Sequence, residues 1–239
     1  MLSEQPLFLS QTLLSLLDTQ VSIQDGDRIP TSGPVLFVSN HRSFMDALLL
    51  MVVANRSIRF ACHRYMSQVP LLREVTAQLG CLPLRADARG QQEFFRQATQ
   101  LLQRQQAVGI FPEGASAMVE VGQPSQVGSF QRGFAHLALQ ANTPDLKILP
   151  IAIASQQETC QPLFPLQLLS WFDPSEPLFQ QAGWHSMVIY RRVKVLVGQP
   201  LPVSAIEQDS YRGSSKAIAR DLSERCQQSI QALLAEGYA

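Results

Sequence analysis

Several features that mark particular classes of protein are missing from this 239-residue sequence. The longest unbroken apolar run, residues 47–54, is eight residues long. A membrane-spanning helix needs about 20 apolar residues, so the sequence predicts no such helix. The four cysteines show neither Cys-x-x-Cys pairs nor the spacing of a zinc site, and we expect reduced thiols and no bound metal. No glycine-rich loop of the kind that cradles a nucleotide is present either.

The chain also lacks a net charge, because 19 basic side chains balance 19 acidic ones. A balanced chain has no general attraction to nucleic acid, and we expect no nucleic-acid partner. The apolar content of 46% is sufficient for the core of one large α/β domain at this length. No secretion signal is visible, so we expect a cytoplasmic protein.

Short apolar runs alternate with helical periodicities along most of the chain. We expect strands at residues 35–39, 58–62, 81–84, 107–111, 147–153 and 188–197. The expected helices lie at 44–54, 67–79, 91–104, 132–141 and 213–235. This alternation predicts an α/β fold with a mixed, largely parallel sheet flanked by helices. Residues 155–186 break the pattern and are expected to form either a substrate-lining excursion or an irregular connection.

Residues 2–21 have the periodicity of an amphipathic N-terminal helix with a broad leucine-rich face. That face could lie in a membrane interface, where basic residues usually help. The polar side carries only Glu4 and Asp18, and no basic residue. Docking onto the protein's own core is the other interpretation, and the sequence leaves both open.

The most informative feature is the pair His41 and Asp46, which lies between a predicted strand and a predicted helix. Ser43 can accept a backbone N–H at the start of that helix. Asp46, one turn inside the helix, can accept the Nδ1–H of His41, which leaves Nε2 free to act as a base. A surface histidine near an aspartate at a helix start is the alternative. No serine or cysteine nucleophile is needed if the substrate supplies its own hydroxyl.

A second motif, Phe-Pro-Glu-Gly at residues 111–114, lies at the end of the predicted strand 107–111. Ligands of open α/β sheets bind beyond the carboxyl ends of the strands. We therefore expect Glu113 and Gly114 to lie at the same sheet edge as His41. An ordinary turn is the competing interpretation of this motif.

Taken together, these motifs resemble the glycerolipid acyltransferase family, typified by 1-acylglycerol-3-phosphate acyltransferase. The first family block matches Asn40, His41, Ser43 and Asp46, and the Phe-Pro-Glu-Gly block matches without change. Further matches are a glycine followed by a strand ending in arginine at 80–85, a Phe-x-x-Gly-x-x-x-Leu-Ala element at 130–138 and a proline between aliphatics at 149–151. On this resemblance, an N-terminal helical segment (1–30) precedes an acyltransferase domain (31–239).

The resemblance implies an enzyme that transfers a fatty acyl group from acyl-CoA or acyl carrier protein, without a cofactor. The acceptor would be the free hydroxyl of a lysoglycerolipid, above all 1-acylglycerol-3-phosphate, which would give phosphatidic acid. His41 would be the general base, oriented by Asp46. The implied substrate-binding residues are Asn40, Ser43, Arg85, Phe111, Pro112, Glu113, Gly114 and Arg132. A lipid acceptor also implies peripheral association with a membrane surface.

One departure from the family pattern concerns the acceptor. Thr-Arg usually follows the Glu-Gly pair, and the arginine is thought to help hold the acceptor phosphate. Here Ala115 and Ser116 follow, and the next basic residue is Arg132. The acceptor therefore stays open between 1-acylglycerol-3-phosphate and another lysophospholipid, a glycolipid or an amino-acid lipid. A thioesterase, in which water replaces the acceptor, and a non-catalytic lipid-binding module are the remaining alternatives.

Overall fold

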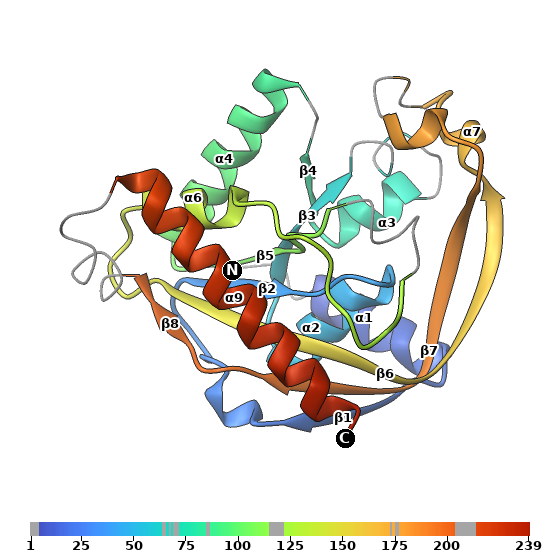
Figure 1. Cartoon of the computed structure of the whole chain (residues 1–239), viewed down its shortest axis with the longest axis horizontal. Coiled ribbons are helices and arrows are strands. Elements are labelled where there is room, and N and C mark those ends of the chain that lie inside the picture. The colour runs from blue at the N-terminus through green and yellow to red at the C-terminus, as the bar shows by residue number, and fades with distance from the viewer. Residues whose placement is uncertain are drawn as a thin grey trace.

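A mixed sheet forms the centre of the molecule (Figure 1). The structure is a computed structural model that describes residues 5–63, 66, 68, 72–84, 87–114, 122–172, 174, 177–203 and 214–239. Within these residues the sheet has eight strands in the order β1-β7-β6-β2-β5-β3-β4, and β8 pairs with β6. In chain order the strands are β1 (Gln20–Gln24), β2 (Val35–Ser39), β3 (Ile58–His63), β4 (Leu82–Leu84), β5 (Ala107–Ile110), β6 (Lys147–Pro165), β7 (Trp184–Val197) and β8 (Leu201–Pro202).

The central strands are parallel. β2 pairs in parallel with β5 on one side and β6 on the other, and β3 lies in parallel between β5 and β4. All five residues of β2 are buried, as expected for a strand covered on both faces. β7 runs antiparallel to β6, and β8 is also antiparallel to β6. The prediction of a mixed, largely parallel sheet is therefore confirmed.

Helices cover both faces of the sheet. One hydrophobic cluster joins the sheet to α4 (Ala88–Gln103), α6 (Gly133–Gln140) and α9 (Ser215–Gly237). The cluster on the other face includes residues of α1 (Gln5–Leu16) and α2 (Met45–Ala54). The remaining helices are α3 (Leu72–Gln78), α7 (Leu166–Leu169) and the short 3-10 turns η1 (Gly26–Arg28) and η3 (Pro177–Gln180). Among the helices that the structure describes, none has both the length and the hydrophobicity needed to cross a bilayer.

The N-terminal helix docks onto the protein's own core, as the second of the two interpretations above predicts, and its contact with a membrane stays a prediction. Leu14 is buried in the α2 side of the core, and the buried Ser10 hydroxyl contacts the sulfur of Met51 at 3.7 Å. The predicted helix over residues 17–21 is wrong, because α1 ends at Leu16 and β1 then pairs with β7. Residues 20–24 alternate polar and apolar side chains, but five residues are too few to separate a strand from a helix by periodicity.

The expectation of an irregular segment over residues 155–186 is also wrong in part. β6 continues to Pro165 and β7 begins at Trp184, so the two strands form a long hairpin whose connection contains α7 and η3. Prolines and a lack of apolar alternation argue against a strand in the sequence. They are tolerated here because, beyond Ile151, β6 pairs with β7 and no longer with β2.

Candidate active site

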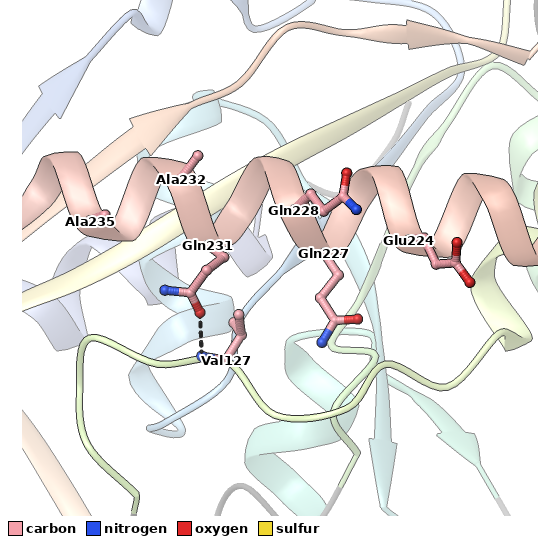
Figure 2. A pocket seen from close by; sticks show the side chains of 7 residues that line it. All are labelled: Val127, Glu224, Gln227, Gln228, Gln231, Ala232 and Ala235. Atoms are coloured by element: carbon pink, nitrogen blue, oxygen red, sulfur yellow. Dashed lines mark hydrogen bonds between the residues drawn. The ribbon is translucent and has the colours of Figure 1, made fainter.

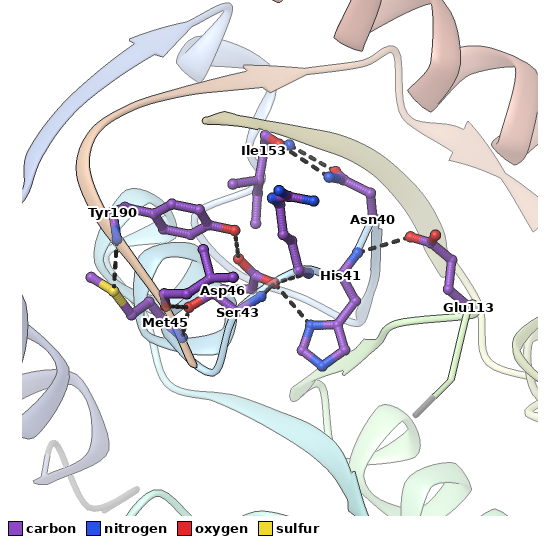
Figure 3. A network of polar contacts seen from close by, with 10 residues as sticks. Asn40, His41, Ser43, Met45, Asp46, Glu113, Ile153 and Tyr190 are labelled. Atoms are coloured by element: carbon purple, nitrogen blue, oxygen red, sulfur yellow. Dashed lines mark hydrogen bonds and ion pairs between the residues drawn. The ribbon is translucent and has the colours of Figure 1, made fainter. Parts of the chain in front are cut away.

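The predicted contact between His41 and Asp46 is present. His41 Nδ1 lies 2.8 Å from Asp46 Oδ2, in the turn that joins β2 to α2 (Figure 3). The imidazole ring stacks on Phe111, with the ring centroids 4.2 Å apart and the planes within 10°. The Asp46 side chain is fully buried, whereas that of His41 is 16% exposed. The arrangement buries the carboxylate and leaves the imidazole accessible.

Hydrogen-bond donors surround the Asp46 carboxylate. Besides His41, the backbone N–H groups of Arg42 and Ser43 donate to Oδ2 at 2.7 and 2.8 Å. The Tyr190 hydroxyl donates to Oδ1 at 2.8 Å. Burial and the charge of Asp46 raise the pKa of Tyr190 well above its usual value, so this hydroxyl stays protonated. Because Asp46 accepts all these bonds, Nδ1 of His41 carries the ring proton in the neutral imidazole and Nε2 has the free lone pair.

Asn40 and Ser43 tie this turn to the neighbouring strands. The Asn40 amide both donates to the backbone carbonyl of Ile153 (3.0 Å) and accepts its N–H (2.8 Å). Ser43 Oγ accepts the N–H of Met45, the first residue of α2, and donates to the carbonyl of Val188 at 2.6 Å. Ser43 thus makes the predicted contact at the helix start. Both side chains position the turn, and their contact with a substrate stays a prediction.

Glu113 joins the second motif to the first. Its Oε1 accepts the backbone N–H of His41 at 2.9 Å, and its Oε2 accepts the N–H of Gly128 at 2.6 Å. Gly114 follows with a φ of 72°, and a Cβ there would lie 2.9 Å from the Gln131 side chain, so the turn requires glycine. The Pro112 carbonyl accepts the N–H of Gln131 at 2.8 Å. The two motifs therefore meet at one sheet edge, as predicted.

An ion pair next to His41 closes one side of the site. Arg42 Nε donates to both carboxylate oxygens of Glu158, at 3.0 and 2.9 Å, and Arg42 Nη1 donates to the carbonyl of Gly122 at 2.6 Å. Burial acts to raise the pKa of Glu158, but the hydrogen bond and charge of Arg42 outweigh it and hold that pKa below its usual value. The positive charge of Arg42 is therefore matched within the protein.

A pocket of about 370 Å³ opens beside these residues. It is lined by Asn40, His41, Arg42, Glu113 and the segment 122–129. Of the remaining predicted site residues, Arg132 is exposed at the start of α6 and does not line this pocket. Arg85 lies outside the described residues.

The pocket wall formed by residues 122–129 is held by the C-terminal helix, α9. Gln231 accepts the N–H of Val127 at 3.1 Å (Figure 2, which shows a separate pocket between α9 and Val127). Gln231 also donates to the carbonyl of Ser125 at 3.1 Å, and Gln227 donates to the carbonyl of Gly128 at 2.9 Å. The same wall is bonded to Glu113 through Gly128. The sequence carries no signal for these contacts, because a glutamine on an exposed helix face is ordinary.

Replacing Gln231 should weaken catalysis without removing any residue that lines this pocket. Gln231→Leu deletes two hydrogen bonds to the wall, each worth about 1 kcal/mol, and we expect kcat/KM for acyl transfer to fall about 3- to 30-fold. The matched control is Gln228→Leu, an exposed glutamine of the same helix that, among the described contacts, makes no hydrogen bond to residues 122–129. Equal kinetics for the two variants would show that α9 does not position the wall.

Known proteins resemble this chain in both sequence and structure. The family model described as Acyltransferase matches residues 20–154. Two curated relatives, the chloroplastic 1-acyl-sn-glycerol-3-phosphate acyltransferases LPAT1 of Arabidopsis thaliana and BAT2 of Brassica napus, are each 26% identical over 136 residues. These matches cover 56% of this chain but only 36% and 37% of the relatives, so the chain spans little more than a third of their length.

Among solved structures, the 1-acyl-sn-glycerophosphate (LPA) acyltransferase PlsC from Thermotoga maritima has a similar fold. The TM-score is 0.65 at 16% sequence identity, and the superposition covers 99% of this chain and 79% of that chain. The likeness of fold therefore extends over nearly the full length of this chain.

Proposed function

The chain belongs to the Acyltransferase family, and from this premise we propose that it transfers a fatty acyl group from an acyl thioester to the free hydroxyl of a lysoglycerolipid. The acceptor named for its relatives, 1-acylglycerol-3-phosphate, is the first candidate. The donor is acyl-CoA or acyl carrier protein, since both present the same thioester. The observation that carries the proposal is the His41–Asp46 pair, which borders a pocket beside the Phe-Pro-Glu-Gly turn.

The reaction follows from the protonation state of the pair. The acceptor hydroxyl gives its proton to Nε2 of His41 as its oxygen attacks the thioester carbonyl. The tetrahedral intermediate then collapses, the carbon–sulfur bond breaks, and His41 returns the proton to the leaving thiolate. The buried negative charge of Asp46 stabilises the imidazolium that exists between these steps. An ester and a free thiol are the products, so atoms and protons balance without a further reactant.

The surrounding contacts support this assignment because they leave His41 little freedom. Phe111 fixes the plane of the ring, Asp46 fixes its rotation, and Glu113 holds the backbone N–H. A base held in one orientation before the substrate arrives loses little entropy in the transition state. We therefore assign to Glu113 and Phe111 the role of positioning His41.

A second candidate acceptor is favoured by the charges of the pocket. Among the described residues that line it, Arg42 is the one lysine or arginine, and Glu158 neutralises it. Arg132, an implied phosphate ligand, does not line the pocket, which leaves Arg85 for that role. An acceptor without a phosphomonoester, such as a glycolipid or an amino-acid lipid, fits a pocket with this balance of charge.

Initial rates with a labelled acyl-CoA separate the two acceptors. For 1-acylglycerol-3-phosphate, we expect a rate at least about tenfold above that for the matching monoacylglycerol, because a charge-assisted hydrogen bond to phosphate contributes about 1.5–3 kcal/mol. Arg85→Gln should remove most of that preference, whereas Arg89→Gln, an exposed residue of α4, should keep it. Equal rates on both lipids would exclude the phosphate-specific acceptor, and full-rate release of fatty acid without any acceptor would indicate a thioesterase.

A further inference from the structure

The long hairpin of β6 and β7 extends beyond the sheet edge at which His41 lies. β6 runs parallel to β2 up to the pair Ser39–Ile151 and then continues to Pro165 (Figure 1). We call the described part of the connection and its flanking tryptophan, residues 166–172, 174 and 177–184, the hairpin tip. Within it, Phe179 of η3 contacts the ring of His63, at the end of β3, with ring centroids 5.5 Å apart. The hairpin tip is thus anchored beside the carboxyl end of a central strand.

The hairpin tip has a small core of its own and an apolar exterior. Leu166, Leu169 and Phe179 are buried. Four of the nine exposed large hydrophobic side chains in the described residues lie here, namely Leu168, Trp171 (81% exposed), Phe172 and Trp184 (54% exposed). A cluster of exposed tryptophans leaves apolar surface in contact with water, which is unfavourable. Such clusters are typical of surfaces that bind a membrane or another protein.

The charges around the hairpin tip restrict the partner. Residues 159–190 contain no lysine or arginine, and their charged residues are Asp173 and Glu176. An acidic carrier protein, a nucleic acid or a strongly anionic membrane would be repelled rather than attracted. Tryptophan, by contrast, is the residue enriched at the boundary between lipid headgroups and acyl chains, where its ring is apolar and its N–H meets water.

A second copy of the chain fits this surface less well than a bilayer does. A stable dimer buries about 800 Å² on each partner, contributed by about 20–30 residues. The exposed apolar part of the hairpin tip consists of four large side chains. A bilayer needs no such area, because each aromatic ring inserts independently.

We propose that the hairpin tip docks the protein onto a neutral lipid bilayer, with Trp171 and Trp184 in the interfacial region, on the side to which the edge carrying His41 opens. The purpose of this docking rests on the proposed function, since a lysoglycerolipid acceptor resides in the membrane.

Intrinsic fluorescence tests the proposal directly, because the chain has two tryptophans and both lie in the hairpin tip. Adding phosphatidylcholine vesicles should shift the emission to shorter wavelength, and phosphatidylcholine with brominated acyl chains should quench it. Both effects should persist at high salt. Emission unchanged by vesicles, or a response that requires anionic lipid and disappears with salt, would overturn the proposal.

Vesicle sedimentation with paired variants identifies the surface. The Trp171→Ser/Phe172→Ser variant should lose at least about tenfold in partition onto phosphatidylcholine vesicles, since burying each ring contributes about 1.5–3 kcal/mol. The matched control, Phe8→Ser/Leu16→Ser, changes two apolar residues of α1 that are 71% and 77% exposed and should partition like the native chain. Thermal unfolding confirms that both variants fold.

Two other outcomes would assign the docking surface or the partner differently. Loss of partition in the α1 variant alone would move the docking surface to the N-terminal helix and overturn the proposal. Self-association that depends on Trp171 and Phe172, without vesicle binding, would identify a second copy as the partner instead. No acyl donor or acceptor is present in these assays, so a negative result leaves acyl transfer by His41 untouched. Conversely, vesicle binding without any acyl transfer would refute the proposed function alone.

Discussion

His41→Ala should lower the rate of acyl transfer by about 10²–10⁴-fold, the usual contribution of a positioned general base. The loss should fall on kcat, with the KM for the acyl donor little changed, because the proton is transferred in the transition state and not on binding. Transfer from a labelled acyl-CoA to 1-acylglycerol-3-phosphate, measured under single-turnover conditions, separates the chemical step from product release. The effect is large because no other described histidine lines the pocket beside Glu113.

The control for this variant is His136→Ala on α6, a partly buried histidine that does not line the pocket. It should transfer acyl groups at the native rate. Unchanged activity in His41→Ala would remove the proposed mechanism, whatever the acceptor. Equal losses in both variants would show that the assay reports folding and not catalysis.

Two substitutions of Asp46 should distinguish its contribution to the free energy of unfolding from its contribution to kcat. Asp46→Ala leaves two backbone N–H groups, the Tyr190 hydroxyl and the His41 ring without their acceptor in a buried place. Removing one partner of such a buried charged network costs about 3–5 kcal/mol of unfolding free energy. Asp46→Asn can keep the geometry, because its carbonyl oxygen can take the place of Oδ2 and its amide can donate to the Tyr190 oxygen.

For Asp46→Asn we therefore expect a loss of only about 1 kcal/mol in urea unfolding but about a 100-fold fall in kcat, since the imidazolium loses its counter-charge. Tyr190→Phe is the companion variant. It removes one donor to the carboxylate and should cost about 1.5–3 kcal/mol of stability, the range for a hydrogen bond to a charged group. Native kcat in Asp46→Asn would show that the carboxylate only supports the fold.

Local sequence was sufficient for the parts of the fold that depend on short-range patterns. β2 has the predicted bounds, and α2, α4, α6 and α9 lie within a few residues of the predicted helices. Apolar runs of four to six residues in a sheet covered by helices on both faces produce a clear signal, because both faces of the strand are buried. The contact between His41 and Asp46 was also predictable, since both residues belong to one strand-to-helix turn.

The rest of the candidate site depends on contacts between residues far apart in the chain. Tyr190 reaches Asp46 from β7, and Glu158 reaches Arg42 from the extended part of β6. A tyrosine two residues after Val188 in a buried stretch of strand indicates a hydroxyl in need of a partner, but nothing local identifies that partner. The hydrogen bonds of Gln231 to Val127 and Ser125 likewise join residues that are far apart in the chain. The hairpin itself was missed because its outer half has a neighbour on one side only and shows no apolar alternation.

The anchoring of the turn between β2 and α2 determines whether the candidate site could be separated from the rest of the fold. Residues 20–154, which match the family model, contain both motifs, yet partners of the motif residues Ser43 and Asp46, and of Arg42 between them, lie beyond residue 154. Val188 accepts the Ser43 hydroxyl, Glu158 pairs with Arg42, and Tyr190 bonds to Asp46. If residues 20–154 were grafted onto another protein, His41 and Asp46 would be present, but the contacts from β6 and β7 that orient their turn would be missing. The candidate site therefore needs the whole sheet, including the hairpin of β6 and β7. Substitutions in β6 or β7 can disorder the site although every motif residue is unchanged.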